Sequence, residues 1–338
     1  MVKKMGLCTP FSLIIRNFAA MMRRLSFLIV AIAMMLPVLA GKPKIGLALG
    51  GGGAKGAAEV GVLKVLEEAG IHVDYIAGTS IGSIVGGLYA SGYSAKELET
   101  MFQTQEWLSL LTDRKAGLSN EPYKTVDGVT YIFGFPVLDR NSGGFGVMRG
   151  GKIEQVLDSM LAARRCTTFE KLRVPFRCVA ADIRTAHEVV LSEGSLSKAM
   201  RASMAIPGIF KPVERGDYML VDGGMLNNLP VDVCRAMGAD IVIAVDLQQA
   251  ELQPRKQTDV SPLSGIAGLF GFEGVLEWIT NRPDILKYQE NCKKADIYIH
   301  PNLPDADASS FGNKNAVRMI RAGEEAAKNQ WDKLKKLK

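Results

Sequence analysis

Ser80 is the residue whose surroundings most clearly indicate chemistry. It is the centre of a Gly-Thr-Ser-Ile-Gly pentapeptide at residues 78–82, between the apolar run 73–77 and the small-residue segment 81–90. A Gly-x-Ser-x-Gly turn between a strand and a helix is where a serine hydrolase presents its nucleophile. The flanking glycines allow a strained turn that a Cβ would obstruct. A glycine-rich turn with an incidental serine is the alternative interpretation of the pentapeptide taken alone.

A second glycine-rich segment lies just upstream. The apolar run 45–49 leads into a loop at residues 50–56, and a helix follows. Apolar residues at helical spacing between 62 and 69 mark this helix, and Gly70 ends it. The first turn of a helix carries unpaired amides and the positive end of the helix dipole. The loop is therefore placed to hold an anion.

Three kinds of anion compete for this loop. A P-loop needs a hydroxyl after its lysine, but Lys55 is followed by Gly56. A dinucleotide fits the Gly-x-Gly-x-x-Gly spacing of residues 51–56, yet Asp74 lies at the start of the next strand, and a ribose-binding acid belongs at the carboxyl end. The third anion is the oxyanion of acyl transfer, which requires preorganised backbone amides close to a nucleophile. The glycine loop and the Ser80 turn together supply both parts.

A nucleophilic serine needs a base, and histidine is the usual choice. The three histidines lie outside the expected end of the strand before Ser80 and are interpreted as surface or structural residues: His72, His187 and His300. Asp222 is the better candidate, because it follows the strand-like run 218–221 and precedes two glycines. It thus sits at a strand end that permits a sharp turn. An Asp-Gly-Gly turn without a catalytic role is the alternative.

Taken together, these segments resemble the patatin-like phospholipase family. The family pattern has a Gly-Gly-Gly-x-Lys/Arg-Gly loop, a Gly-x-Ser-x-Gly turn and an Asp-Gly-Gly/Ala turn, matched here at 51–56, 78–82 and 222–224. A fourth block, 202–212, is similar to the family's Ala-Ser-x-Ala-x-Pro segment before the catalytic aspartate. The resemblance covers roughly residues 44–245. Four blocks in the same order are far more specific than any one of them.

The resemblance implies a catalytic dyad of Ser80 and Asp222, without a histidine. It also implies an oxyanion hole formed by the amides of Gly51, Gly52 and Gly53, and hydrolysis of lipid acyl esters, with no metal and no cofactor. Other residues of the matched motifs would support this site: Lys55, Gly56, Gly78, Gly82, Gly223 and Gly224. Lys55 could add positive potential for a phosphate headgroup or lie solvated in its loop.

The elements that must position these residues alternate between strands and helices. Further strands are expected at 176–183, 187–191 and 240–245, and helices at 196–205 and 231–237. This order predicts an α/β fold with three layers, in which a mainly parallel central sheet carries helices on both faces.

Two segments interrupt this alternation. Residues 104–150 are rich in glycine and aromatic residues, with an expected strand pair at 129–135 and 144–148, and could form a flap over the site. The apolar residues 266–279 could cover an acyl pocket, contact a membrane or pack in the interior. The expected domain covers 41–338, with its motifs in 44–245 and a C-terminal extension in 246–338.

The N-terminal residues 1–40 have the pattern of a signal peptide. Arg23 and Arg24 precede an apolar run that ends Val-Leu-Ala at residue 40, as at a signal-peptidase site. The run is short for a membrane span, which needs about 18 to 20 apolar residues. We expect an exported protein, periplasmic or secreted, and an uncleaved membrane anchor is the alternative. Residue 41 is glycine, which argues against lipoprotein processing.

The basic charge of the chain is concentrated in this segment. Residues 1–40 contain five basic residues and no acid, so removing them lowers the formal net charge from +6 to +1. This balance gives no support to nucleic-acid binding. The basic stretch 328–338 could make peripheral contact with anionic lipid or form a solvated helix. Cys166, Cys178, Cys234 and Cys292 remain after signal removal, and their spacing matches no metal site.

The sequence therefore predicts an exported serine esterase that acts on lipid or phospholipid esters. A dinucleotide-binding oxidoreductase is the alternative from another class. A non-catalytic lipid-binding protein on the same fold is a third, against which the presence of both Ser80 and Asp222 argues.

Overall fold

The computed structural model describes residue 18 and residues 21–27, 42–113, 116–118, 120–132, 135–139, 148–248 and 284–338. Contacts divide the chain into Met1–Pro43 and Lys44–Lys338. Most of the predicted signal segment, with its cleavage site, and the apolar run 266–279 lie outside the described residues. Among the helices that are described, none combines the length and apolar character needed to cross a bilayer.

An eight-stranded sheet is the centre of the larger unit. Its strands in chain order are β1 (Ile45–Leu49), β2 (Tyr75–Thr79), β6 (Phe176–Asp182), β7 (His187–Leu191), β8 (Val213–Arg215), β9 (Tyr218–Asp222), β10 (Ile241–Val245) and β11 (Ile297–Ile299). They are ordered β11-β10-β1-β2-β6-β9-β8, and β7 also pairs with β6. The pairs from β11 to β6 are parallel, and the pairs involving β7, β8 and β9 are antiparallel.

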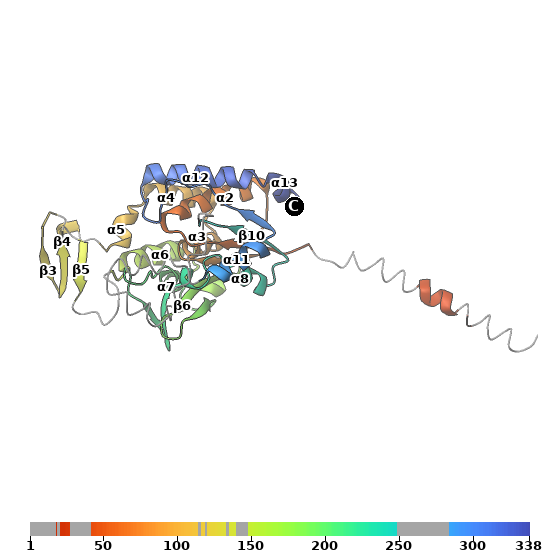
Figure 1. Cartoon of the computed structure of the whole chain (residues 1–338), viewed down its shortest axis with the longest axis horizontal. Helices are drawn as coiled ribbons and strands as arrows, with labels where there is room; N and C mark the ends of the chain where they lie inside the picture. Colours follow the sequence, from red (N-terminus) through yellow and green to blue (C-terminus); the bar gives the residue numbers. More distant parts are fainter. Residues whose placement is uncertain are drawn as a thin grey trace, which may run out of the picture. The chain divides into compact units, whose positions relative to one another are not determined.

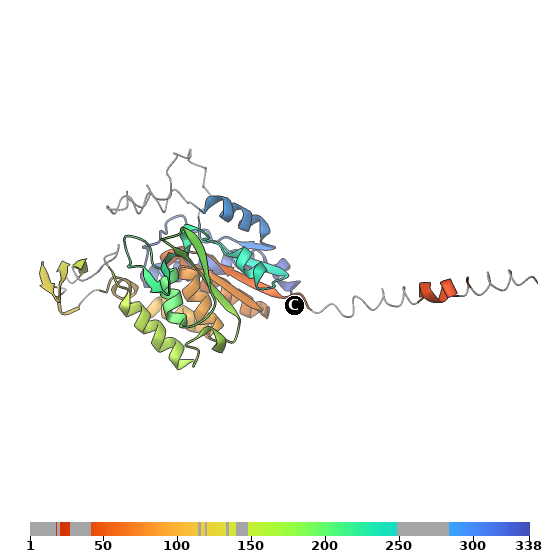
Figure 2. The same cartoon turned by 90° about the horizontal axis from the view of Figure 1, so that it is seen from below.

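Helices cover both faces of this sheet, as Figures 1 and 2 show. One face packs against α2 (Ala57–Ala69), α3 (Ile81–Ala90), α4 (Ala95–Thr104), α6 (Gly151–Ala163) and α7 (Leu196–Ser203), with α12 (Asn313–Lys328) and α13 (Trp331–Lys335) against α2. The other face packs against α8 (Val231–Ala236) and α11 (Ile285–Lys294). This arrangement confirms the predicted three-layer α/β fold.

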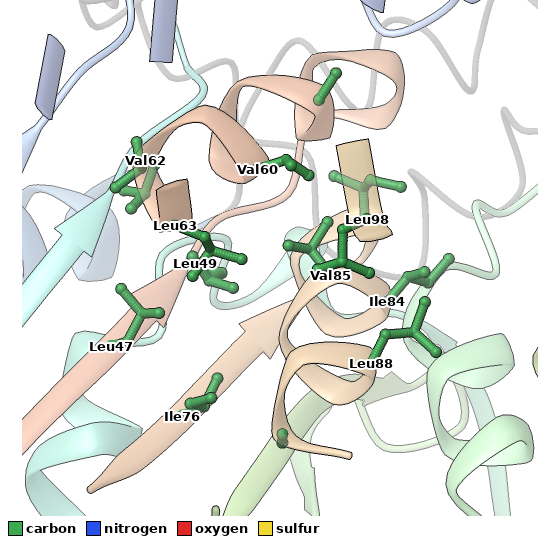
Figure 3. Close-up of a cluster of buried hydrophobic side chains, with 14 of the residues drawn as sticks. Leu47, Leu49, Val60, Val62, Leu63, Ile76, Ile84, Val85, Leu88 and Leu98 are labelled. Atoms are coloured by element: carbon green, nitrogen blue, oxygen red, sulfur yellow. The ribbon is translucent and has the colours of Figure 1, made fainter. Parts of the chain in front are cut away.

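The two faces follow from alternation along the strands. Leu47 and Leu49 of β1 point into the larger core beneath α2 and α3, whereas Ala48 points into the smaller core beneath α8. In β2, Ile76 and Ala77 divide in the same way. Figure 3 shows Leu47, Leu49 and Ile76 beneath the leucines and valines of the covering helices. Each fully buried side chain of this size contributes about 1.5 to 3 kcal/mol.

Helix α12 lies unusually close to α2, because each helix has a glycine at the crossing. A Cβ added to Gly61 would lie 1.9 Å from the Ile320 carbonyl oxygen, and one added to Gly323 would lie 1.9 Å from the Ala58 carbonyl oxygen. The C-terminal extension is thus packed into the domain through α12, and β11 adds a strand to the sheet.

The segment between α4 and α6 differs from its prediction. It contains α5 (Trp107–Leu111) and a separate antiparallel sheet of β3 (Lys124–Val126), β4 (Val129–Ile132) and β5 (Phe135–Asp139). The expected partner of 129–135 was 144–148, but β4 pairs with β3 and β5, its neighbours along the chain. Residues 144–147 lie outside the described residues, and Met148 forms a bridge with Phe210. The flap remains a prediction.

The basic C-terminal stretch uses its apolar residues for packing. Leu334 is buried, and Trp331 and Leu337 pack against the core, while Lys333 and Lys335 are exposed. Helix α13 lies against α2 near its carboxyl end, where Lys338 approaches Gly70. Ser80 lies beyond the opposite end of the parallel strands, so contact of this stretch with a lipid surface would turn the serine away from that surface.

Candidate active site

The turn that carries Ser80 is strained. Ser80 follows β2, precedes α3 and has φ 54° and ψ −122°, a conformation that costs a side-chain-bearing residue about 1 to 3 kcal/mol. A Cβ added to Gly78 would lie 2.3 Å from the Gly82 carbonyl oxygen, and one added to Gly82 would lie 2.5 Å from the Leu49 carbonyl oxygen. Both glycines are therefore required for close backbone approach, as the pentapeptide indicates.

Ser80 and Asp222 are brought together by strand β6. In the sheet register, Thr79 pairs with Val179 and Asp222 pairs with the next residue, Ala180. Strand β7 occupies the other edge of β6 over this stretch, so β2 and β9 share one edge and run toward each other. Their carboxyl ends meet there, and the Ser80 hydroxyl donates a 2.7 Å hydrogen bond to Asp222 Oδ2 across 142 residues of chain.

The carboxylate of Asp222 is oriented by its own turn. Its Oδ1 accepts a 2.7 Å hydrogen bond from the Gly224 amide at the start of η4 (Gly223–Met225), which leaves Oδ2 for Ser80. Burial raises the pKa of Asp222 to about 6, although the hydrogen bonds from Ser80 and Gly224 act in the opposite direction. The carboxylate is thus ionised at neutral pH, yet basic enough to take up a proton.

This pKa predicts the pH dependence of hydrolysis. A base must be ionised to accept the proton of Ser80, so kcat/KM for a soluble ester is expected to fall about tenfold per pH unit below pH about 6 and to level off above it. The measurement is a rate profile between about pH 4.5 and 8, with circular dichroism showing that the protein stays folded. A rate that stays flat down to the lower end would contradict Asp222 as the base.

The glycine loop lies beside Ser80. A Cβ added to Gly51 would be 3.2 Å from Ser80 Cβ. The amide of Gly51 donates a 3.0 Å hydrogen bond to the Asn228 carbonyl oxygen, and its part in an oxyanion hole stays a prediction. The amides of Gly52 and Gly53 donate no hydrogen bond to any residue that the structure describes. Two of the three predicted amides are therefore uncommitted.

Positive φ is required at one position of this loop. Gly53 has φ 58°, and a Cβ there would lie 2.4 Å from the Ala308 carbonyl oxygen. The loop continues as η1 (Gly53–Gly56), where Lys55 Nζ donates a 2.6 Å hydrogen bond to the Leu247 carbonyl oxygen. Lys55 thus ties the loop to the chain just after β10, and this contact gives it a structural role.

Two residues that support the site have roles that the sequence did not assign. Ser203, in the fourth matched block, accepts a 2.9 Å hydrogen bond from the Ser80 amide and donates one of 2.6 Å to the Val179 carbonyl oxygen. Asn228 Nδ2 donates a 3.2 Å hydrogen bond to the carbonyl oxygen of Gly51, whose amide it also binds. The only sequence signal for these roles is proximity to the Pro-Gly and Asp-Gly-Gly motifs.

The histidines lie apart from this pair. His72 is exposed before β2, His187 is exposed at the start of β7, and His300 Nδ1 lies 3.1 Å from the Asp246 carbonyl oxygen. No hydrogen bond recorded among the described residues joins a histidine to Ser80 or Asp222. The histidine positions therefore agree with their interpretation as surface or structural residues.

The structure argues against the dinucleotide alternative. Asp74 lies before β2, where Oδ2 accepts a 2.8 Å hydrogen bond from the Ile45 amide. It therefore fixes the start of β1, at the edge of the sheet opposite the glycine loop. Within the described ranges, no cluster of histidine, cysteine or acidic residues is suited to hold a metal ion, and the four cysteines are free thiols.

Glu59 is a buried carboxyl group beneath the glycine loop. It lies in the first turn of α2, is fully buried, and neither carboxyl oxygen has a hydrogen-bond partner in the described part of the chain. Burial raises the pKa of Glu59 well above its ordinary value of 4.5, and the amide of Gly50, which already donates to Val245, opposes this shift only in part. Burial of Glu59 without a partner therefore favours its neutral form.

This predicts a pH-dependent stability that a substitution removes. Folding raises the pKa of Glu59, so the neutral side chain favours the folded state in full below its ordinary pKa of 4.5. This contribution to stability is lost progressively as the pH rises from there through the pKa of the folded state. The Tm of Glu59→Gln relative to the parent is expected to increase between about pH 5 and pH 8. The exposed Glu68 of the same helix supplies the control, Glu68→Gln, because folding does not bury its side chain. If the Tm of the parent and the Tm of Glu59→Gln changed equally with pH, a raised pKa of Glu59 would be contradicted.

The comparisons with known proteins agree on one family. A family model for patatin-like phospholipase matches residues 47–235, more than half of the chain. Patatin-like phospholipase domain-containing protein 6 of Homo sapiens is 35% identical over 219 residues, which cover 64% of this chain and 14% of that protein. An uncharacterized NTE family protein of Mycobacterium tuberculosis is 32% identical over 217 residues, covering 64% of this chain and 52% of that protein.

A solved structure supports the same fold. The crystal structure of VipD from Legionella pneumophila aligns with a TM-score of 0.50 at 14% identity, covering 87% of this chain and 67% of that chain. The residues matched by the family model contain both Ser80 and Asp222, together with the glycine loop. The chain belongs to the patatin-like phospholipase family.

Proposed function

We propose that the protein is a serine lipid acyl hydrolase of phospholipase A or esterase type, with Ser80 as nucleophile and Asp222 as base. Family membership supports lipid hydrolysis. The observation that carries the specific proposal is the 2.7 Å hydrogen bond from the Ser80 hydroxyl to Asp222 Oδ2 in a strained turn. The carboxylate reaches the hydroxyl directly, so no histidine is needed between them.

The reaction proceeds in two steps. Ser80 Oγ attacks the ester carbonyl carbon while its proton passes to Asp222, and the amides of Gly52 and Gly53 stabilise the charge that develops on the carbonyl oxygen. The alcohol leaves with the proton from Asp222. Water, deprotonated by the same carboxylate, then attacks the acyl-enzyme. The fatty acid leaves as Asp222 returns this proton to Ser80 Oγ. One oxyanion donor contributes about 3 kcal/mol to such a transition state.

Incubation of the protein with lipid dispersions tests this function. Phosphatidylcholine vesicles, phosphatidylglycerol vesicles and a triacylglycerol emulsion are incubated in parallel, and mass spectrometry measures free fatty acid, lysophospholipid and diacylglycerol. Time-dependent release of fatty acid from at least one of them, absent with Ser80→Ala, is expected. Lipid binding without release, by a folded protein that does not react with a fluorophosphonate probe, would instead indicate the non-catalytic lipid-binding protein.

We further propose that the protein is exported. The support is the arrangement of Arg23, Arg24 and the apolar run before Gly41. Protein recovered from the periplasm of a bacterial host is expected to begin at Gly41 by N-terminal mass spectrometry. An uncleaved chain in the membrane fraction would support the anchor, and an uncleaved chain in the cytosol would contradict both.

A further inference from the structure

Helix α11 packs on the face of the sheet opposite α2 and α3, and it bonds to the segment that follows Asp222. It lies beside α8, as Figure 1 shows. Asn291 is its most deeply buried polar residue, with 1% of its surface exposed. Its Nδ2 donates hydrogen bonds of 3.0 Å to Asn227 Oδ1 and 2.9 Å to the Leu229 carbonyl oxygen. Both acceptors belong to the segment 222–229 that begins with Asp222.

Asn227 connects this helix to the nucleophile turn. Its carbonyl oxygen accepts a 2.9 Å hydrogen bond from the hydroxyl of Thr79, the residue before Ser80. The backbone amide of Asn227 donates to the Gly223 carbonyl oxygen and so closes the turn that follows Asp222. Asn227 is fully buried, so its side-chain bonds are made without competition from water.

The acidic residues around Asn227 keep its side chain in one orientation. Its Nδ2 donates to Glu188 Oε1 at 3.1 Å and to Asp232 Oδ1 at 2.9 Å, and Asn291 Nδ2 also lies 3.1 Å from Asp232 Oδ1. Lys287, one turn before Asn291, forms ion pairs with both acids. Burial favours the neutral form of Asp232, but hydrogen bonds from Lys287, Asn227 and Asn291 hold its pKa below the ordinary value. The acceptor is thus a carboxylate.

The next residue completes the connection. Asn228 accepts the Gly51 amide and donates to the Gly51 carbonyl oxygen, so the same segment fixes the glycine loop. Segment 222–229 therefore contacts every part of the site: it supplies Asp222, holds the Ser80 turn through Thr79 and holds the loop through Gly51. Among the residues described, Asn291 is the one side chain from outside the family match at 47–235 that hydrogen-bonds to this segment.

We infer that Asn291 is a positioning residue for acyl hydrolysis, which acts through Asn227 and Leu229 to hold Asp222 and Ser80 in hydrogen-bond distance. This inference rests on the proposed function. Removal of the Asn291 amide takes away two of the hydrogen bonds that hold this segment. The contacts of Asn227 with Thr79, Glu188 and Asp232 remain, but Asp222 and Ser80 are then held at a less fixed separation. A displacement of about 1 Å at such a pair costs on the order of 100-fold in rate.

The test compares Asn291→Leu with Lys294→Met. Leucine has nearly the shape of asparagine but donates no hydrogen bond. Lys294→Met removes an ion pair with Glu290 on the same helix, and in the described structure the Lys294 side chain bonds neither to segment 222–229 nor to the acids around Asn227. Each variant is assayed for kcat and KM on a soluble ester, for the rate of fluorophosphonate labelling and for the pH profile. Asn291→Leu is expected to lower kcat and the labelling rate about 10- to 100-fold with KM nearly constant. Greater solvation of Asp222 is expected to move the acid limb of the profile below pH about 6.

Thr79→Val extends the test if Asn291→Leu does not fold. Valine keeps the shape of threonine and removes only the hydroxyl that binds the Asn227 carbonyl oxygen. It leaves α11 in place, and a comparable loss of kcat is expected. A folded Asn291→Leu or Thr79→Val protein with parental kcat and labelling rate overturns the inference, as does an equal loss in Lys294→Met. Failure of the proposed function is distinguishable, because the parent itself would then not label.

Discussion

Replacing Ser80 with alanine is expected to abolish ester hydrolysis and labelling by a fluorophosphonate probe, while the protein remains folded. The hydroxyl is the nucleophile in the proposed mechanism, and loss of a catalytic serine lowers kcat by up to about a millionfold. Among the described residues, its hydrogen bond to Asp222 is the one side-chain hydrogen bond that alanine removes. The backbone strain at φ 54° is nearly the same for serine and alanine, so the turn itself is retained.

Ser91→Ala is the matched control. Ser91 is also buried and ends the helix that Ser80 begins, and its hydroxyl donates to the Leu88 carbonyl oxygen. This variant should label and hydrolyse like the parent. If Ser80→Ala still hydrolysed a short-chain nitrophenyl ester at close to the parental rate, the assignment of the nucleophile would be wrong.

Asp222→Asn is expected to lower kcat/KM about a hundred- to ten-thousandfold. The amide keeps the shape of the carboxyl group but accepts no proton, and losses of general base catalysis are of this size. The variant should be no less stable than the parent at pH about 8. Folding raises the pKa of Asp222 from 3.8 to about 6. Above pH about 6 the folded parent therefore buries an ionised carboxylate, which lowers its stability, and asparagine carries no such charge.

The histidines provide the comparison for this result. His72→Gln, His187→Gln and His300→Gln should each retain activity within a few-fold on the same ester, because none is hydrogen-bonded to the Ser80 and Asp222 pair in the described structure. A collapse of kcat/KM in a folded histidine variant, together with an active Asp222→Asn, would replace the dyad with a serine and histidine arrangement.

The fold could be predicted because local patterns carry it. The apolar runs that contain β1, β6 and β10 alternate with amphipathic helices, and their boundaries fall within one or two residues of the expected ones. The strand β2 is shifted, because Tyr75–Thr79 extends to the serine where 73–77 was expected. Apolar character ends at Ala77, but Gly78 and Thr79 continue the pairing with β6 through backbone hydrogen bonds that composition does not reveal.

The meeting of Ser80 and Asp222 was predicted from a family resemblance and has no local signal. It depends on β9 running antiparallel to β6 while β2 runs parallel to it, and neither direction is encoded in the strand itself. Sequence patterns also miss the hydrogen bond from the Gly51 amide to Asn228, which lies 177 residues away. They miss the role of Asn291 as well, because nothing distinguishes it from any other asparagine on an amphipathic helix. Polar contacts between distant segments become visible only in three dimensions.

The register of β6 also decides which changes in chain length the protein can tolerate. Successive residues of a strand are about 3.3 Å apart and point to opposite faces. Deletion of one residue, Leu220 or Val221, would therefore shift Asp222 by one position in the strand and move its carboxylate out of reach of the Ser80 hydroxyl. The same deletion in the turn 183–186, which connects β6 to β7, leaves the Ala180 and Asp222 pairing in place. Insertions and deletions among natural relatives should accordingly collect in such turns and avoid these three residues.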